Sequence, residues 1–221
     1  METKLEPYNC LICGELDNYA SNRVCHNCTA KIWMSEMNYS YMEGILKFYE
    51  YALTTRDPYE DGHGKRVADL AVRLAHALGY SLDFIEKLKY GALFHDVGKL
   101  ILPVELLNKK FLSDVEFRKV RTHAREGYLL FQKLGINGMI LGIIGGHHEN
   151  YDGTGYPMKL YGTGISDGAR IIRICDSSDA MTSTRSYGVQ RTRSETLEEM
   201  IRCQNEYDPN MLAVFAGLEW R

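Results

Sequence analysis

Apolar residues recur at three- and four-residue steps through most of the chain after the Asp57-Pro58 pair. This spacing places them on one face of an α-helix, whereas a half-buried β-strand would alternate apolar and polar residues. The proline marks a break before this part of the chain. The pattern therefore predicts an all-α main domain.

Side chains that bind metals fall on the helix faces that are predicted to be buried. In the segment that starts at His63, apolar residues follow on the same face, and His76 lies on the opposite one. Four other segments show the same pattern: Ile85, Leu88 and Ala92 lead to His95 and Asp96, Phe117 and Val120 lead to His123, Ile140, Ile143 and Ile144 lead to His147 and His148, and Ile172 and Ala180 flank Asp176, with Asp179 one turn away.

Five inward-facing histidines and two inward-facing aspartates in one small domain indicate a metal site. A single buried histidine is usually a hydrogen-bonded core residue, but a buried acid is costly unless a cation accompanies it. Nitrogen and carboxylate donors without thiolate suit Fe, Mn or Zn, and seven donors exceed what one ion takes. We therefore expect two ions, which at ~3.5–4 Å can hold a bridging hydroxide as nucleophile and cleave a phosphodiester.

Four cysteines near the N-terminus form two closely spaced pairs. Cys10 and Cys13 are separated by two residues, as are Cys25 and Cys28, and eleven residues lie between the pairs. Four thiolates in this arrangement favour a tetrahedral Zn²⁺, which would stabilise a segment too short for its own core. The pattern predicts a hairpin with a zinc knuckle at each end. Unligated thiols or a redox pair are the alternative.

These patterns divide the chain into three parts. Residues 1–30 are predicted to form a zinc-ribbon-like module, residues 31–55 a linker helix, and residues 56–221 the catalytic domain. The linker prediction depends on an apolar stripe made of Met34, Met37, Tyr41, Ile45, Phe48 and Tyr49. The ribbon is favoured as a contact for a protein partner or as structural support, and the linker helix is a candidate for oligomerisation or regulatory input.

Composition and charge restrict the class of protein further. The 221 residues are 45% hydrophobic and 25% charged, which excludes a disordered or low-complexity chain. The net charge of −3 is spread along the chain, so nucleic acid is not expected as the main partner. The longest apolar stretch, Gly138–Gly146, is too short for a membrane span, and the start lacks the pattern of a signal peptide. We expect a cytoplasmic protein.

Several ordered motifs resemble the HD-GYP subgroup of the HD phosphohydrolase superfamily. They include His95-Asp96-Val97-Gly98-Lys99 and, downstream, the run from His147 to Pro157 with the sequence HHENYDGTGYP. The resemblance covers residues 56–215 and also takes in His63, His123 and the run from Ala169 to Tyr187. It implies a helical HD-type domain and a bacterial phosphodiesterase that hydrolyses cyclic di-GMP to the linear dinucleotide, in some members on to GMP.

The resemblance also implies roles for individual residues. Lys99 and Asp179 match positions that handle the scissile phosphate and the activated water, and Arg185 matches a phosphate contact. The implied metal ligands are His63, His95, Asp96, His123, His147, His148 and Asp176. Gly153, Gly155, Tyr156 and Pro157 match the signature loop that borders the substrate groove.

Part of this assignment also follows from the residues themselves. Lys99 follows His95 by four residues and Asp96 by three, so its ammonium can reach the same site and neutralise a phosphate oxygen. A solvated surface lysine is the alternative. For Tyr156, a packing role is the alternative to substrate contact.

Two departures from the family pattern bear on the chemistry. Members with three metals add a carboxylate one turn before the first histidine, where this chain has Tyr59, and Glu60 and Asp61 are expected to point elsewhere. This favours two metals and a linear product. Where the family often places a basic residue after Tyr187, this chain has Gly188, so that Arg191 or Arg193 would have to substitute.

Three alternative functions stay open. The same chemistry could act on cyclic GMP-AMP or another nucleotide, because the motifs do not fix the bases. A non-catalytic signalling or scaffold protein would use the loop and the ribbon to bind partners. Nucleic-acid binding through the ribbon is disfavoured by the mildly acidic chain.

Overall fold

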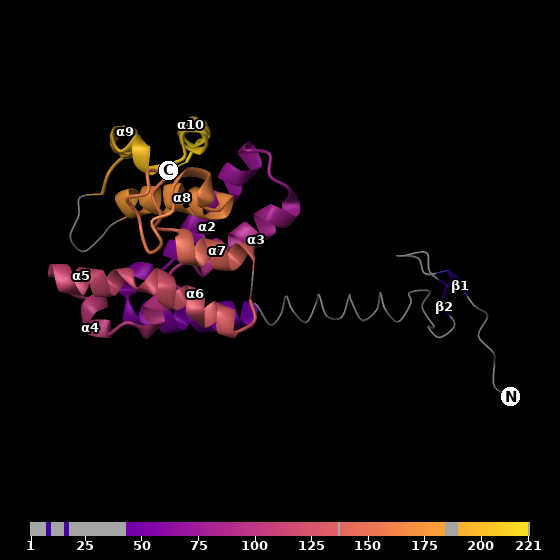
Figure 1. Ribbon diagram of the computed structural model, residues 1–221, viewed down its shortest axis with the longest axis horizontal. Helices are drawn as coiled ribbons and strands as arrows, with labels where there is room; N and C mark the ends of the chain where they lie inside the picture. Colours follow the sequence, from indigo (N-terminus) through magenta and orange to yellow (C-terminus); the bar gives the residue numbers. More distant parts are fainter. Residues whose placement is uncertain (1–7, 10–15, 18–42, 137, 184–189, 221) are drawn as a thin grey trace. The chain divides into compact units, whose positions relative to one another are not determined.

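The computed structural model describes residues 8–9, 16–17, 43–136, 138–183 and 190–220 (Figure 1). The chain forms two units, Met1–Phe48 and Tyr49–Arg221. In the first unit, β1 (Tyr8–Asn9) and β2 (Leu16–Asp17) pair antiparallel, with Tyr8 opposite Asp17. The predicted zinc ligands lie outside the described residues: Cys10, Cys13, Cys25 and Cys28.

The described part of the second unit is helical, which confirms the predicted all-α fold. A helix over residues 43–56 leads into it. The longer helices are α2 (His63–Ala77), α3 (Leu82–Leu93), α5 (Asp114–Arg121), α6 (His123–Lys133), α7 (Met139–Gly146), α8 (Asp167–Thr182), α9 (Arg193–Arg202) and α10 (Pro209–Gly217). The short elements are η1 (Pro58–Glu60), η2 (Val97–Ile101), α4 (Val104–Leu107), η3 (Gly162–Gly164) and η4 (Gln204–Glu206). Among the described helices, none is both long and apolar enough to cross a lipid bilayer.

Local sequence signals start several of these helices. Ser113 caps α5 and Thr192 caps α9, each accepting a hydrogen bond from the backbone N–H three residues on. In both, the glutamate at that position, Glu116 or Glu195, bonds back to the backbone of the cap residue. Such capping boxes satisfy backbone donors that the helix itself leaves unpaired.

The core lies where α2, α3, α7 and α8 pack together. Helix α2 contacts both α3 and α8, and α7 contacts α3, α6 and α8 (Figure 1). The predicted apolar stripes supply this core, and its fully buried members include Leu74, Leu88, Ile143, Ile144 and Ile172. Burying each such side chain contributes about 1.5–3 kcal/mol. His76 is exposed, as predicted.

One predicted stripe does not reach the core. The side chain of Phe117, which was expected to lead the buried face toward His123, is 52% exposed. Helix α5 ends at Arg121, and α6 starts at His123 after Thr122, so the two helices do not share one continuous face.

Gly98 brings η2 into backbone contact with the start of α6. A Cβ atom built on Gly98 would lie 1.9 Å from the carbonyl oxygen of His123 and 2.6 Å from the backbone nitrogen of Gly127. Since these neighbours are backbone atoms, they cannot move aside as a flexible side chain could. The contact therefore fixes the His95-Asp96 segment against His123.

We expect Gly98→Ala to lower the free energy of unfolding by at least about 2 kcal/mol, because overpacking against backbone forces the two elements apart. Gly217→Ala is the matched control, since a Cβ atom there meets nothing within 4 Å. That variant is expected to change stability by no more than about 1 kcal/mol. Urea unfolding monitored by circular dichroism measures both, and equal stabilities would contradict the contact.

Candidate metal centre and signature loop

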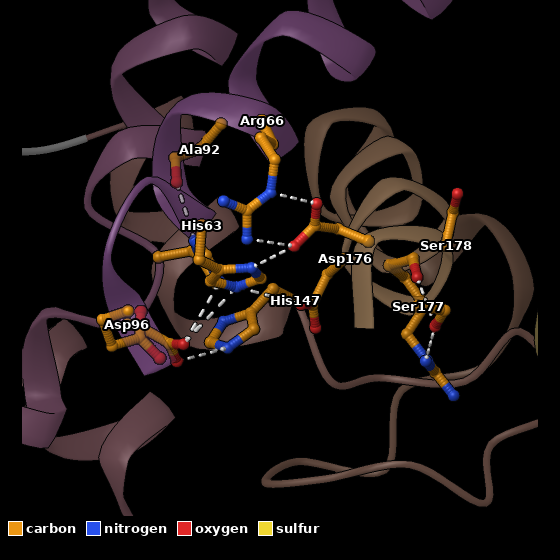
Figure 2. Close-up of polar contacts among 12 residues, drawn as sticks. His63, Arg66, Ala92, Asp96, His147, Asp176, Ser177 and Ser178 are labelled. Carbon is orange, nitrogen blue, oxygen red and sulfur yellow. Dashed lines mark hydrogen bonds and ion pairs between the residues drawn. The ribbon is translucent and has the colours of Figure 1, made fainter. Parts of the chain in front are cut away.

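The structure brings all seven residues with predicted metal-binding roles into one cluster. Their donor atoms form two sets, and within each set the atoms lie within 4.8 Å of one another. One set is Asp96, His123, His147 and His148, and the other is His63, His95 and Asp176. Figure 2 shows His63, Asp96, His147 and Asp176 pointing toward the same space. Either set could hold a divalent ion.

Most of these ligands lie at helix ends. His63 is the first residue of α2, and His123 is the first residue of α6. His147 follows the last residue of α7, and Asp96 directly precedes η2. Chain segments from distant parts of the sequence therefore meet at their termini, where side chains can converge without crossing a neighbouring helix.

Three of the imidazoles are oriented by backbone carbonyl groups. In each, Nδ1 lies close to the carbonyl oxygen three residues earlier: His95 to Ala92 at 2.7 Å, His123 to Val120 at 2.8 Å, and His147 to Ile144 at 2.8 Å. Since a carbonyl can only accept, Nδ1 carries the proton and Nε2 of the neutral ring carries a lone pair. This arrangement is typical of histidines that bind metals.

The Nε2 atoms face one another inside the cluster. Nε2 of His123 lies 3.1 Å from that of His147, and Nε2 of His63 lies 3.3 Å from that of His95. Two lone pairs at such a separation repel unless a proton or a cation lies between them. Oδ1 of Asp96 is also buried, and it lies 3.0 Å from Nε2 of His123. The clustered donor atoms therefore need a positive charge between them, and divalent metal ions can supply it.

The pKa shifts of the histidines agree with this need for positive charge. Burial is the main cause that lowers the pKa of His147 to about 4, and burial also holds the pKa of His148 well below its usual value. Both rings therefore stay neutral at pH 7. Burial opposes the charged form of His63, but hydrogen bonds to Asp176 and Asp179 outweigh it and raise the pKa to about 10. A metal ion would have to displace this proton, so its affinity should fall as pH falls.

The two predicted carboxylate ligands are anionic. Burial alone would raise the pKa of Asp96, but the nearby Lys99 ammonium, with further contributions from His95 and His123, holds it well below the usual value. The pKa of Asp176 is lowered in the same way, mainly by its hydrogen bond with His63. Both groups are therefore in the form that binds a metal.

Asp179 orients His63 from the side away from the Nε2 atoms. Its Oδ2 atom lies 2.8 Å from Nδ1 of His63. Arg66 donates to both oxygens of Asp179, from Nε at 2.7 Å and from Nη2 at 3.1 Å. A contact of Asp179 with water would have to use its remaining lone pairs. Arg66 was not among the predicted site residues, although its position one turn after His63 on the same helix was a usable signal.

Lys99 is held inside the cluster. Its Nζ atom donates to Oδ2 of Asp96 at 2.6 Å and to Oε1 of Glu60 at 2.5 Å. The side chain is 15% exposed, so the alternative of a solvated surface lysine is wrong.

The expectation that Glu60 points away from the site is also wrong. Glu60 is only 6% exposed, and with His63 and Asp96 it forms a third group of donors. Helical spacing counted back from His63 fails because Pro58–Glu60 is a 3-10 turn and Gly62 has a φ of 70°. Tyr59 at the expected carboxylate position is therefore no argument against a third ion.

The signature loop lies against His148. The ring of Tyr156 stacks on the ring of His148 with 4.7 Å between centroids. Gly155 permits this, since a Cβ atom there would lie 2.2 Å from the backbone nitrogen of Asn150. Gly153 has a φ of 79°, a left-handed conformation that favours glycine. The Tyr156-Pro157 peptide bond is cis.

Glu149 fastens the far side of this loop. Its carboxylate is buried and accepts hydrogen bonds from the backbone nitrogens of Met158 at 2.6 Å and Leu160 at 3.0 Å. The residue follows His148 directly, so one short segment carries both a candidate ligand and the support of the loop. Glu149 was not among the predicted site residues.

A cavity of about 790 Å³ lies beside Asp179, between α2, the end of α8 and the start of α9. Its lining includes Arg66 and Arg191, and it is within the size range of small-molecule sites. Arg191 lies 3.3 Å from Glu199. Arg193 donates to the carbonyl oxygens of residues 216 and 218. The predicted phosphate contact Arg185 lies outside the described residues, as does Gly188.

Comparison with known proteins gives a family match over most of the chain. A profile described as an HD domain matches residues 47–211. This range contains all seven candidate metal ligands and the signature loop.

Curated relatives share about a third of their residues with the matched region. Cyclic di-GMP phosphodiesterase PA4108 of Pseudomonas aeruginosa is 33% identical over 165 residues, which cover 74% of this chain and 40% of the relative. The 3'3'-cGAMP-specific phosphodiesterase 3 of Vibrio cholerae is 35% identical over 149 residues, which cover 67% of this chain and 32% of the relative. The chain thus spans less than half the length of either relative.

Solved structures show the same helical arrangement. Bd1817, an HDG"Y"P protein from Bdellovibrio bacteriovorus, superposes with a TM-score of 0.60 at 24% identity, covering 70% of this chain and 50% of that protein. The cyclic GMP-AMP specific phosphodiesterase V-cGAP3 of V. cholerae gives a TM-score of 0.51 at 27% identity, covering 80% of this chain and 41% of that protein.

We expect His95→Ala and Asp96→Ala to weaken Mn²⁺ binding by at least about a hundredfold, because each removes a donor from the cluster, and even second-sphere partners are worth ~10–100-fold. Calorimetric titration and metal analysis of reconstituted protein measure the effect, with zinc counted separately. His76→Ala, which changes an exposed histidine, is the matched control. Manganese affinity equal to that of the control would contradict the assignment of these ligands.

Glu149→Gln is expected to loosen the signature loop. The amide keeps one acceptor oxygen for two backbone donors, and an unpaired buried donor costs about 1–3 kcal/mol. Hydrogen exchange at Met158 and Leu160 should accelerate, measured by mass spectrometry of the native protein. Glu126→Gln, on the partly exposed side of α6, should leave this exchange unchanged, and equal exchange in both variants would contradict the role of Glu149.

Proposed function

Because this chain belongs to the HD-domain family, we propose that it is a metal-dependent phosphodiesterase that hydrolyses a cyclic dinucleotide, with cyclic di-GMP as the first candidate, to the linear dinucleotide. One observation carries the proposal: four imidazole Nε2 atoms and the carboxylates of Asp96 and Asp176 converge, and each of these four rings is fixed through its Nδ1 atom. This is the arrangement that metal-assisted hydrolysis requires.

We propose two divalent ions, Fe or Mn, one for each main donor set. Nitrogen and oxygen donors without thiolate suit these metals. When bound, such ions supply Lewis acidity toward water and toward a phosphoryl oxygen. The third group of donors differs, because the ammonium of Lys99 already bonds to its carboxylates, Glu60 and Asp96. This pairing supports two ions and hydrolysis that stops at the linear dinucleotide.

The remaining residues act on the substrate and on the ligands. We expect the Lys99 ammonium, which has a third N–H donor besides those bonded to Asp96 and Glu60, to neutralise an oxygen of the scissile phosphate. Asp179 fixes the tautomer of His63, and its own position depends on Arg66. Tyr156 contacts the centre through His148, and the cavity beside Asp179 offers space for a substrate larger than its scissile phosphate. Gly153, Gly155 and Pro157 stay predicted to border the substrate groove. Arg185 stays a predicted phosphate contact.

A cyclic GMP-AMP dinucleotide is the second candidate substrate. The relatives of similar identity are named for cyclic di-GMP and for 3'3'-cGAMP, so their likeness does not separate the two. A non-catalytic scaffold is disfavoured, because a scaffold has no need for seven converging donors. The structural zinc, a protein partner of the ribbon, oligomerisation through the linker helix and the cytoplasmic location stay predictions from the sequence.

The test is anaerobic incubation of protein reconstituted with Fe²⁺ or Mn²⁺ with cyclic di-GMP and, separately, with 3'3'-cGAMP. Chromatography resolves the substrate, the linear dinucleotide and the mononucleotides. We expect the linear dinucleotide to accumulate. Rapid conversion to GMP would overturn the proposed product and favour an ion at Glu60.

Variants decide whether the metal centre performs the reaction. His95→Ala and Asp96→Ala should lower turnover at least about a thousandfold, since bound metal supplies several kcal/mol of transition-state stabilisation. His76→Ala should retain full turnover. Unchanged turnover in both ligand variants would overturn the mechanism, and metal-loaded protein that binds a dinucleotide without converting it would favour the scaffold.

A further inference from the structure

Arg121 places a positive charge beside the metal centre, on the side of the signature loop. It is the last residue of α5, and its guanidinium lies 4.0 Å from the centroid of the Tyr156 ring. The same ring also stacks on the candidate ligand His148, at 4.7 Å between centroids. The guanidinium therefore contacts Tyr156, and Tyr156 in turn contacts a candidate metal ligand.

The hydrogen-bond donors of Arg121 have no partner among the described residues. Other arginines near the centre are paired with acids, as Arg66 is with Asp179 and Arg173 with Glu206. Stacking on an aromatic ring uses the face of the guanidinium and leaves its N–H groups, which lie in its plane, available. Arg121 is thus a cation whose donors are open to a ligand.

The surroundings of Arg121 also restrict its movement. The ring of Tyr156 covers one side, and the ring of Phe117 lies 5.8 Å from the guanidinium. Tyr156 in turn belongs to the loop that Glu149 fastens. A side chain held in this way loses less conformational entropy when it binds an anion.

We propose that Arg121 binds the second, non-scissile phosphate of the cyclic dinucleotide, which makes it a specificity-determining residue. The inference depends on the proposed function. A cyclic dinucleotide carries two phosphodiesters in one ring, and the ions with Lys99 can engage only one of them at a time. The other phosphate needs a separate cation close by, and a planar guanidinium can bond to it through two donors. Arg121 meets both conditions with its own described contacts.

This contact would act on substrate binding more than on the chemical step. The second phosphate keeps its charge throughout the reaction, so its bond to Arg121 has the same strength in the ground state and in the transition state. Removing such an interaction raises KM and leaves kcat nearly unchanged. Hydrolysis of a substrate with only one phosphodiester should not depend on Arg121.

Steady-state kinetics of Arg121→Met and Arg121→Lys on cyclic di-GMP test the proposal, with bis(4-nitrophenyl) phosphate as the substrate with one phosphodiester. Methionine keeps much of the packing on Tyr156 but has no charge. We expect Arg121→Met to raise KM for cyclic di-GMP about 10–100-fold, the worth of a charged hydrogen bond. Arg121→Lys should recover part of this loss. Cleavage of the single diester should change less than about threefold in either variant.

Arg125→Met is the matched control, because Arg125 lies four residues further along, is 66% exposed and pairs with Glu126. Its KM should match that of the wild type. If KM for cyclic di-GMP is unchanged in Arg121→Met, the phosphate contact is overturned while the proposed function stands. If both substrates lose activity equally, Arg121 merely supports the loop, and the proposal is again overturned.

Binding measurements separate this proposal from the proposed function. Calorimetry of cyclic di-GMP with wild type and Arg121→Met, both loaded with metal, applies even where turnover is not detected. A weaker Kd in the variant supports the phosphate contact, and an equal Kd overturns it. If the wild type cleaves the single diester but neither binds nor cleaves a cyclic dinucleotide, both the substrate class and the role of Arg121 are overturned.

Discussion

The charge balance of the metal centre is the constraint on which the rest of the structure depends. Asp96 and Asp176 place negative charge among packed helices, which is costly unless positive charge accompanies it. The histidines cannot all supply that charge as protons, because burial keeps His147 and His148 neutral. The remaining positive charge has to come from cations that several ligands share. The ligands can share them because helix termini meet at the centre, where α6 begins and α7 ends.

Rigidity of the centre comes from groups that touch the ligands without being ligands. Backbone carbonyls fix His95, His123 and His147, so the orientation of each ring is set by the end of the helix that precedes it, which is α3, α5 or α7. His63 depends instead on Asp179 and Arg66. These hydrogen bonds hold the lone pairs in place before any ligand binds, which reduces the reorganisation that binding and catalysis require.

In the proposed complex, Lys99 and Arg121 bind different phosphates of the substrate. Lys99 is held inside the cluster by Asp96 and Glu60, next to the space where a scissile phosphate would lie. Arg121 lies outside the cluster and contacts the ring of Tyr156. The signature loop connects Arg121 with the metal centre, because Tyr156 contacts both Arg121 and His148. A loop fastened by Glu149 can thus couple substrate binding to the geometry of a metal ligand.

Local periodicity and motif spacing were enough to predict several features of this protein from its sequence. The helical class, the inward faces of His63 and Asp176, the exposed His76 and the set of candidate ligands followed from positions within single helices or from the family motifs. Other features depend on the tertiary structure, because helical spacing does not predict them. Glu60 turns into the site because a 3-10 turn and Gly62 precede α2, Phe117 is exposed because α5 and α6 are separate helices, and Arg121 meets Tyr156 across 35 positions of the chain. The physical reason is that periodicity fixes the direction of a side chain only within one regular helix, whereas breaks between helices and contacts between distant segments depend on how the whole domain packs.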